Sequence, residues 1–237
     1  MRALPRVMLM LLLGPAAALP GQSLEENWKE CKSDDPENSI QGCSALIQSG
    51  QTTGISLANA LYDRGLAFAH KGDYDRAIQD YDQALRLSPT FANAFYSRGA
   101  AYAHKGGYDH AFQDYDQALR LNPRLANALY DRGAAYAHKG DFDRAIQDYN
   151  QALVINPNLP DALYGQGLAY LHKLDYDNAI EDFDQALRIN PSYADALIGR
   201  GNAFRRKGDY DRAIQDFNQA LRLNPSFWEA FYGRASA

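Results

Sequence analysis

The feature that most constrains this 237-residue chain is a repeat of 34 residues. The first and third units are identical at 25 of 34 positions, and all 16 tyrosines fall in only five columns of the unit. A fixed column for each aromatic residue indicates one packing arrangement used again and again. We therefore expect a linear array in which each unit packs on its neighbours. Five consecutive units, called repeats one to five, cover residues 58–91, 92–125, 126–159, 160–193 and 194–227.

Each unit contains two helical patterns separated by a short break. In repeat one, Leu61 and Phe68 recur at helical spacing before the break, and Tyr81 continues a second apolar face after it. Gly72 can end the first helix in a left-handed conformation, and Asp73 can cap the second. A proline near the end of every unit stops the second helix, because the residue before a proline is pushed away from helical geometry. The chain is therefore expected to be all-α.

The unit has a recurring pattern of bulky, glycine, aromatic, alanine, aromatic, alanine and proline residues. In repeat one these are Leu61, Gly65, Phe68, Ala77, Tyr81, Ala84 and Pro89. Over residues 58–237 the chain resembles the tetratricopeptide repeat (TPR) family, and in particular exported proteobacterial TPR proteins. The resemblance implies a right-handed superhelical solenoid of helix-turn-helix pairs whose first helices line a concave groove that binds ligands. Small residues at Gly65 and Ala77 would allow the two helices of a pair to approach closely.

The regions outside the five repeats have distinct expectations. Residues 1–18 combine two arginines, an apolar run and three alanines, which is typical of a secretory signal peptide, so we expect an exported protein in the periplasm or outside the cell. The apolar run is too short to span a bilayer, and no membrane insertion is expected. Residues 19–57 are expected to form a capping helix pair. Residues 228–237 would be the first helix of an incomplete sixth unit.

Two cysteines, Cys31 and Cys43, are the only ones in the chain and fall on the two helices expected for the cap. In an exported protein such a pair favours one disulfide. Two free buried thiols are the alternative. The exposed end of the array raises a separate expectation, because Trp228, Phe231 and Ala235 form an apolar stripe with no second helix to cover it. This helix is expected to associate with another copy or with a partner.

Composition and motifs argue against several functions. The net charge of −5 makes nucleic acid a poor partner. There is no glycine-rich phosphate loop, nucleophile elbow, HExxH or CxxC spacing, so we expect neither an enzyme nor a metal site, and no cofactor. Aspartates such as Asp80 and Asp82 are explained by surface charge pairing with Arg76 and Arg86 at a spacing of one helical turn.

Two further charged columns accompany each other along the repeats, and a repeated ion pair between the two helices explains them better than a binding site does. The columns are Arg64, Arg98, Arg132, Arg200 and Arg234 with Asp80, Asp114, Asp148, Asp182 and Asp216. Repeat four departs from this pattern, because Gln166 replaces the arginine and Leu174 replaces the turn glycine. Either repeat four is adapted to a ligand, or it has drifted without consequence.

A histidine column ends the first helices of four repeats, and it comprises His70, His104, His138 and His172. A cation at a helix C-terminus is favoured by the helix dipole, which is a structural explanation. The alternative is a ladder on the inner face that binds an acidic partner or responds to pH. Zinc is disfavoured because its ligands must lie about 2 Å from the ion, whereas neighbouring helices lie about 8–10 Å apart.

The predicted contact surface combines a tyrosine with an amide or acid three residues earlier on the same helix face. Its members are Asn59, Tyr62, Asn93, Tyr96, Asn127, Tyr130, Asp161 and Tyr164. Tyrosine offers an apolar ring with a polar tip, and asparagine can pair with a peptide backbone. The clustered cations Arg205 and Arg206 complete the predicted site. Relatives in the family hold a C-terminal carboxylate through groove lysines and arginines, and the tyrosines here put such a clamp in doubt.

The resulting hypothesis is a scaffold or adaptor of the cell envelope that binds a peptide or protein in the groove of the array. The alternative is a module that binds a small ligand or glycan, or an accessory to a separate enzyme, through the same tyrosine and histidine columns.

Overall fold

The computed structural model describes residues 23–237, and the predicted signal peptide at residues 1–18 lies outside them. The described residues form thirteen α-helices and no β-strand, as the repeat pattern predicts. They fall into two compact units that divide between Ser88 and Pro89. The helices of the first unit are α1 (Leu24–Cys31), α2 (Pro36–Ser49), α3 (Gly54–His70) and α4 (Tyr74–Leu87).

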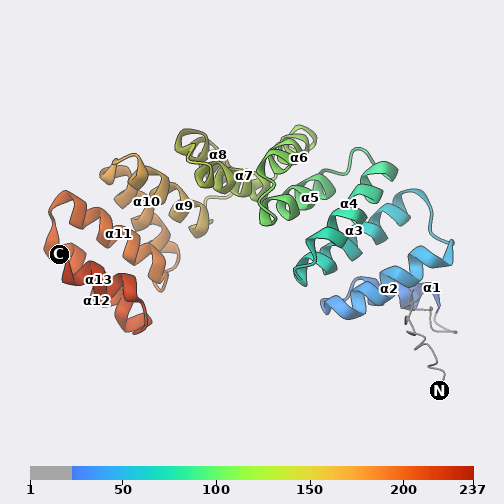
Figure 1. The fold of residues 1–237 in the computed structure, drawn as a ribbon, viewed down its shortest axis with the longest axis horizontal. Coiled ribbons are helices and arrows are strands. Elements are labelled where there is room, and N and C mark those ends of the chain that lie inside the picture. Colours follow the sequence, from blue (N-terminus) through green and yellow to red (C-terminus); the bar gives the residue numbers. More distant parts are fainter. Residues whose placement is uncertain (1–22) are drawn as a thin grey trace, which may run out of the picture. The chain divides into compact units, whose positions relative to one another are not determined.

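The second unit contains four complete helix pairs and one further helix. Figure 1 shows the helices following one another as antiparallel pairs along the chain. Their bounds are α5 (Ala92–His104), α6 (Tyr108–Leu121), α7 (Ala126–His138), α8 (Phe142–Ile155), α9 (Pro160–His172), α10 (Tyr176–Ile189), α11 (Ala194–Lys207), α12 (Tyr210–Leu223) and α13 (Trp228–Ala235).

The turn between α7 and α8 is built as the sequence predicts. Gly140 follows α7 with φ 80°, in the left-handed region that glycine enters without steric cost. Asp141 then caps α8, and its side chain accepts a hydrogen bond from the backbone N–H of Arg144. Leu174 is the one described non-glycine residue with positive φ, at 61°. Repeat four therefore keeps the turn geometry although it lacks the residue that suits it.

Close contact between the two helices of a pair depends on small residues. A Cβ atom built on Gly133 would lie 3.0 Å from Cε1 of Tyr149, the aromatic residue in the middle of α8. A Cβ on Gly167 would lie 2.7 Å from Cε1 of Phe183 in α10. Both ring-bearing residues are buried, so neither ring has room to move aside. The glycine column is thus required by the aromatic column that packs on it.

Successive pairs in the second unit also pack against one another. α9 contacts α7 and α11, and α11 contacts α13, so first helices adjoin first helices along this unit. Fully buried alanines such as Ala152 and Ala186 allow the second helices to pack closely. Because each pair buries its apolar residues against the next, the stability of the array depends on nearest-neighbour interfaces.

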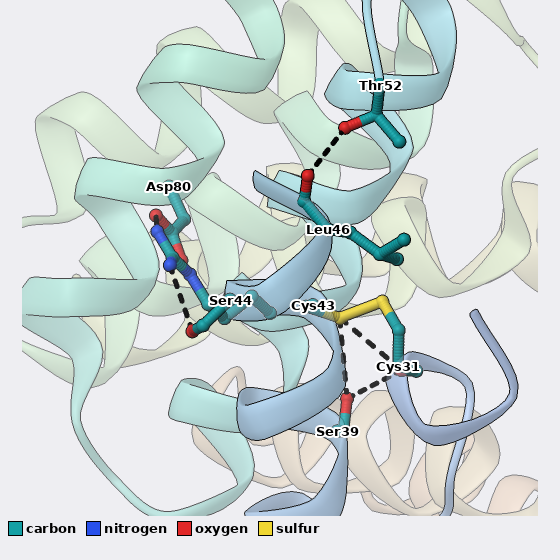
Figure 2. Close-up of a disulfide and its surroundings, with 8 residues drawn as sticks. Cys31, Ser39, Cys43, Ser44, Leu46, Thr52 and Asp80 are labelled. Atoms are coloured by element: carbon teal, nitrogen blue, oxygen red, sulfur yellow. Dashed lines mark hydrogen bonds and ion pairs between the residues drawn. A yellow bond between two sulfur atoms is a disulfide. The ribbon is translucent and has the colours of Figure 1, made fainter. Parts of the chain in front are cut away.

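The first helix pair carries the two cysteines. The structure joins Cys31 of α1 to Cys43 of α2 by a disulfide, with the Cα atoms 4.5 Å apart (Figure 2). Ser39 donates a hydrogen bond of 2.7 Å to the carbonyl oxygen of Cys31 beside it. Thr52 similarly donates to the carbonyl oxygen of Leu46 and fastens the segment that leads into α3. α3 begins at Gly54, so the first helix of repeat one starts before the sequence repeat does at residue 58.

No helix among residues 23–237 is long and apolar enough to cross a membrane.

Candidate protein-binding face

An arginine from each first helix binds an aspartate of the second helix in the same repeat, except in repeat four. Arg132 donates from Nε and Nη2 to the two carboxylate oxygens of Asp148, both at 2.7 Å. Arg64 binds Asp80, Arg98 binds Asp114 and Arg200 binds Asp216 in the same bidentate way. These arginines are therefore structural, as predicted, and hold the two helices of each pair together.

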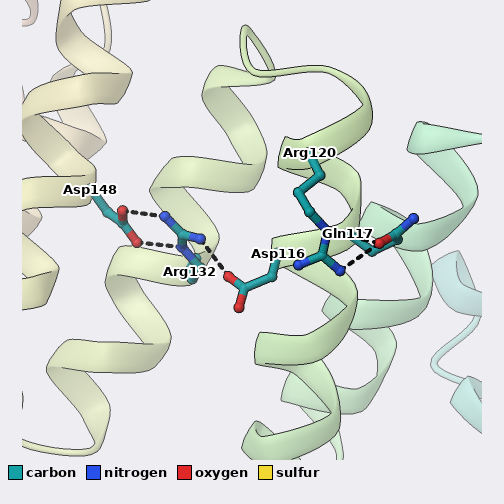
Figure 3. A network of polar contacts seen from close by, with 5 residues as sticks. All are labelled: Asp116, Gln117, Arg120, Arg132 and Asp148. Atoms are coloured by element: carbon teal, nitrogen blue, oxygen red, sulfur yellow. Dashed lines mark hydrogen bonds and ion pairs between the residues drawn. The ribbon is translucent and has the colours of Figure 1, made fainter.

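A second acid, from the preceding repeat, bonds two of these arginines. Nη1 of Arg132 lies 2.5 Å from Asp116 of α6, so the guanidinium bridges two carboxylates (Figure 3). Arg200 contacts Asp184 of α10 in the same way. The predicted pairing of Arg76 with Asp80 along one helix is wrong, because Arg76 binds Asp73 at the helix start, at 2.6 Å. The ion pairs that matter here run between helices.

Repeat four lacks the arginine but keeps the acid. Gln166 is buried at the arginine position and makes no hydrogen bond to Asp182, which is also buried. Oδ2 of Asp182 has no hydrogen-bond partner among the described residues. Burial, with smaller contributions from Glu181 and Asp175, raises the pKa of Asp182 to about 7. This carboxyl group can therefore hold its proton close to neutral pH.

The tyrosine column of the predicted contact surface is only half-exposed. Each ring tilts against the buried aromatic ring of its own second helix, with centroids 5.9 Å apart for Tyr62–Tyr81, Tyr130–Tyr149 and Tyr164–Phe183. Burial raises the pKa of Tyr164 to about 12. Asn59, Asn93, Asn127 and Asp161 are exposed on the same helices. The tyrosines thus support the array as well as facing solvent.

Polar contacts occupy some of these residues. Tyr96 donates a hydrogen bond of 2.8 Å to Oδ2 of Asp131 on the next first helix. Burial still raises the pKa of Asp131 above its ordinary value, and the hydrogen bond offsets part of this effect. Tyr193 donates to Asp161 at 2.8 Å, and its ring lies 5.2 Å from that of Tyr164. These bonds occupy part of the polar surface that the sequence offers to a ligand.

The histidine column lies at the exposed ends of the first helices. The ring of His138 packs against Tyr108 with centroids 4.9 Å apart, and the ring of His172 stacks on Phe142 at 4.6 Å. Each imidazole therefore covers an aromatic ring at the start of the preceding second helix. His70 and His104 are likewise exposed at their helix ends. Packing between repeats is a role for this column that the sequence did not reveal.

Repeat five ends its first helix differently, with Arg205 and Arg206. Neither guanidinium forms an ion pair with any residue in the part of the chain that the structure describes. Nη2 of Arg205 lies 3.4 Å from Oδ1 of Asn202, and its Nε is buried with no hydrogen-bond partner among residues 23–237. The adjacent Lys207, in contrast, binds Asp177 of repeat four. Two positive charges thus remain available on one helix end.

These arginines line one of two adjoining pockets in the second unit. One pocket of about 420 Å³ is lined by Leu168, Leu171, Leu174, Tyr176, Arg205 and Arg206, among others. A second, of about 450 Å³, is lined by Tyr164, Leu168, Leu171, Ile198, Asn202 and Trp228, among others. Because both pockets share Leu168, Leu171 and Asn202, they adjoin each other. We call the two together the α9–α11 groove.

Two sequence models match the repeats. One, described as TPR repeat, matches residues 65–106 and 101–140, and the other, described as Tetratricopeptide repeat, matches 126–159, 160–193 and 194–227. Together they cover residues 65–227, and the three matches of the second model coincide with the pairs α7–α8, α9–α10 and α11–α12. The chain belongs to the tetratricopeptide repeat family. No curated protein sequence matches it significantly.

Solved TPR structures resemble the chain over most of its length. A crystal structure of MamA is 28% identical with a TM-score of 0.64, and covers 68% of this chain and 94% of its own. A TPR protein from Parabacteroides merdae is also 28% identical, with a TM-score of 0.67, covering 75% and 71%. YrrB, described as a TPR protein with an unusual peptide-binding site, has a TM-score of 0.69 at 21% identity, covering 83% and 99%. At that identity the likeness to YrrB concerns the fold alone.

The α9–α11 groove contains residues that the sequence did not single out. Leu168, Leu171, Ile198 and Asn202 lie on α9 and α11 between the predicted tyrosine and arginine positions. Leu168 and Leu171 lie four and seven residues after Tyr164 on α9, and Ile198 occupies the tyrosine position of repeat five, so their spacing could have identified them. No group of acids, histidines and cysteines suited to a metal occurs among the described residues.

Proposed function

We propose that this TPR protein binds a segment of another protein in the α9–α11 groove. The observation that carries the proposal is the groove itself, where Leu168, Leu171 and Ile198 offer an apolar floor beside the ring of Tyr164. Trp228 borders the groove, and 68% of its surface is exposed. It is therefore available to a partner, and tryptophan is a strong energetic anchor at protein interfaces. Family membership supports a role in protein interaction rather than catalysis.

Groove variants with a matched surface control test this function. Proteins retained by the purified chain are first identified by mass spectrometry, and the affinity of one of them is then measured by calorimetry. Trp228→Ala and Ile198→Asp should each weaken binding at least about tenfold, because truncating an interface anchor costs 2 kcal/mol or more. Val154→Ala removes an 84% exposed apolar side chain from α8, outside the groove, and should leave the affinity unchanged. Equal binding by all three variants would place the interaction elsewhere.

We further propose that the protein works in the cell envelope. The disulfide between Cys31 and Cys43 supports this location, because disulfides form and persist in oxidising compartments. The pattern of residues 1–18 supports it too. Fractionation of the native host should place the protein outside the cytoplasm. Intact mass, with thiols alkylated before and after reduction, should reveal no reactive cysteine until reductant is added. A cytoplasmic protein with two free thiols would contradict the proposal.

A further inference from the structure

The α9–α11 groove has a chemically distinct end at the junction of repeats four and five. At the two preceding junctions within the second unit, a histidine ring covers the aromatic residue that begins the earlier second helix, His138 on Tyr108 and His172 on Phe142. At this junction Arg206 takes the histidine position, and no ring or cation contact joins it to Tyr176. The pocket here measures about 420 Å³, compared with about 230 Å³ for the one lined by Tyr108 and His138.

The charge at this end is positive and has no internal partner. Arg205 and Arg206 both line the pocket, and neither forms an ion pair with a described residue. Other cations near this position are neutralised, since Lys173 binds Asp143 and Lys207 binds Asp177. The buried Nε of Arg205 lacks an acceptor, and a buried donor of this kind is costly unless something bonds to it. A carboxylate is the acceptor that guanidinium geometry suits best.

The remaining wall is apolar and includes a strained residue. Leu174 lines the pocket with 68% of its surface exposed, beside Leu168 and Leu171. It has φ 61°, where a residue with a Cβ is less stable than glycine by about 1 kcal/mol. An exposed leucine kept at a position that favours glycine is a cost to the free protein. That cost has a purpose if the side chain contacts a ligand.

We propose that this end of the groove binds an acidic–apolar peptide segment, in which two neighbouring Glu or Asp side chains face Arg205 and Arg206 and adjacent apolar side chains cover Leu168, Leu171 and Leu174. Two guanidinium groups call for two carboxylates, and a pair of acidic side chains supplies both, whereas the main-chain carboxylate of a chain terminus supplies one. The proposal rests on the function proposed above and names the chemistry of its ligand.

Capped peptide pools test this ligand. One pool is acetylated and amidated, carries a fixed Glu-Glu pair and is randomised over Leu, Ile, Phe and Ala at the next four positions. A matched pool carries Gln-Gln instead. The immobilised protein should retain the Glu-Glu pool at least about tenfold more strongly, because hydrogen bonds between charged groups are worth more than neutral ones. Raising the salt concentration should reduce that retention.

Matched arginine variants locate the binding. Arg205→Gln with Arg206→Gln should lose the preference for Glu-Glu, and Arg206→Gln alone should reduce it. Arg188→Gln with Arg222→Gln removes the same charge from exposed second-helix positions and should keep it. Circular dichroism verifies that each variant is folded, and Arg206→Gln, at an exposed site, serves if the double variant is not.

Three outcomes would overturn the proposal. The first is equal retention of the Glu-Glu and Gln-Gln pools. The second is unchanged retention of the Glu-Glu pool by both the double variant and Arg206→Gln. The third is stronger retention of a Gln-Gln pool with a free C-terminus than of the capped Glu-Glu pool. The last would identify a chain end as the ligand. If these occur while Trp228→Ala still weakens the natural partner, the acidic-peptide proposal fails and the groove function stands.

Discussion

Repeats three and four form the same kind of helix pair but differ at one buried aspartate. The aspartate of repeat three is paired with an arginine, and that of repeat four is not. In repeat three Arg132 lies between Asp116 and Asp148, and its guanidinium satisfies both carboxylates. One repeat further along, Asn150 of repeat three and Gln166 of repeat four occupy the positions of Asp116 and Arg132, while Asp182 remains at the position of Asp148. The carboxylate at the Asp116 position has thus been lost together with the arginine, whereas the buried carboxylate at the Asp148 position has been kept.

Repeat four shows that a helix pair can lose its ion pair and still pack. The backbone of α9 and α10 needs no ion pair to pack as the other pairs do, because Phe183 and the surrounding alanines fill the interface. Asp182 has no arginine partner and can instead stay buried as the neutral carboxylic acid, because its pKa is raised to about 7. The net stability that a buried arginine–aspartate pair gives to the fold is therefore smaller than the stability lost when only one of the two partners is removed.

The largest expected effect comes from giving repeat three the chemistry of repeat four. Arg132→Gln leaves both Asp116 and the buried Asp148 without their cation. We expect the free energy of unfolding to fall by about 4 kcal/mol at pH 8, because a buried charge loses its partner. Urea denaturation measures the change. A loss below about 1 kcal/mol would mean that the ion pair is not a main support of this repeat.

A second prediction concerns the pH dependence that Asp182 imposes. Its pKa is about 7 in the folded protein against an ordinary value of 3.8, so between these values the folded state binds more protons than the unfolded state. Stability from this group is fully present below about pH 4 and is lost as pH rises through 7. From pH 5 to pH 8 the unfolding free energy should fall by about 3 kcal/mol.

Asp182→Asn is the matching control for this titration. The amide cannot ionise, so the variant should lose most of the decline and be more stable than the original protein at pH 8. Asp63 and Asp131, whose pKa values are also raised by burial, should supply the smaller slope that remains. Identical pH profiles for the two proteins would show that Asp182 is ionised throughout.

Restoring the arginine in repeat four should have a smaller and opposite effect. Gln166→Arg supplies a cation to Asp182 and should raise the unfolding free energy at pH 8 by about 2 kcal/mol, as a charge-assisted hydrogen bond replaces an uncompensated buried charge. The gain should shrink at pH 5, where Asp182 is protonated. Urea denaturation at both pH values checks this, and an equal gain at both would exclude the charge as the cause.

The smallest predicted effect compares the turns of the two repeats. Leu174→Gly should stabilise repeat four by about 1 kcal/mol, because glycine adopts the left-handed conformation without strain. Gly140→Leu should destabilise repeat three by a similar amount. Thermal melting of both variants measures the pair. A turn that gains nothing from glycine would mean that the contacts of the Leu174 side chain outweigh the backbone strain.

Much of the fold could be predicted from the sequence because the constraint repeats. The glycine and proline positions fix the ends of the helices, and five copies of one pattern leave little ambiguity about which residues pair. The arginine–aspartate pairs between α7 and α8 and between α11 and α12 followed from two columns that accompany each other. The turn caps followed from single residues such as Asp141.

Contacts between repeats could not be predicted in the same way. A periodic pattern gives the face of a helix but not the rotation of one pair on the next, so the bond from Arg132 to Asp116 and the stacking of His172 on Phe142 were missed. The half-burial of Tyr130 was missed as well, although its ring meets Tyr149 within the same pair. The site depends on such lateral packing, which is why the groove residues emerged only from the structure.

The altered polar set of repeat four also bears on how nearly identical helix pairs find their order. An Asn150–Gln166 junction is chemically unlike its neighbours, so a pair docked one place out of register would set an aspartate beside Gln166 and leave its charge without an arginine. Such unfavourable contacts disfavour misassembly and so help to specify the order in which the helix pairs pack. We expect Asn150→Asp with Gln166→Arg to yield a more stable protein that refolds less faithfully, measurable as a larger aggregated fraction after dilution from denaturant.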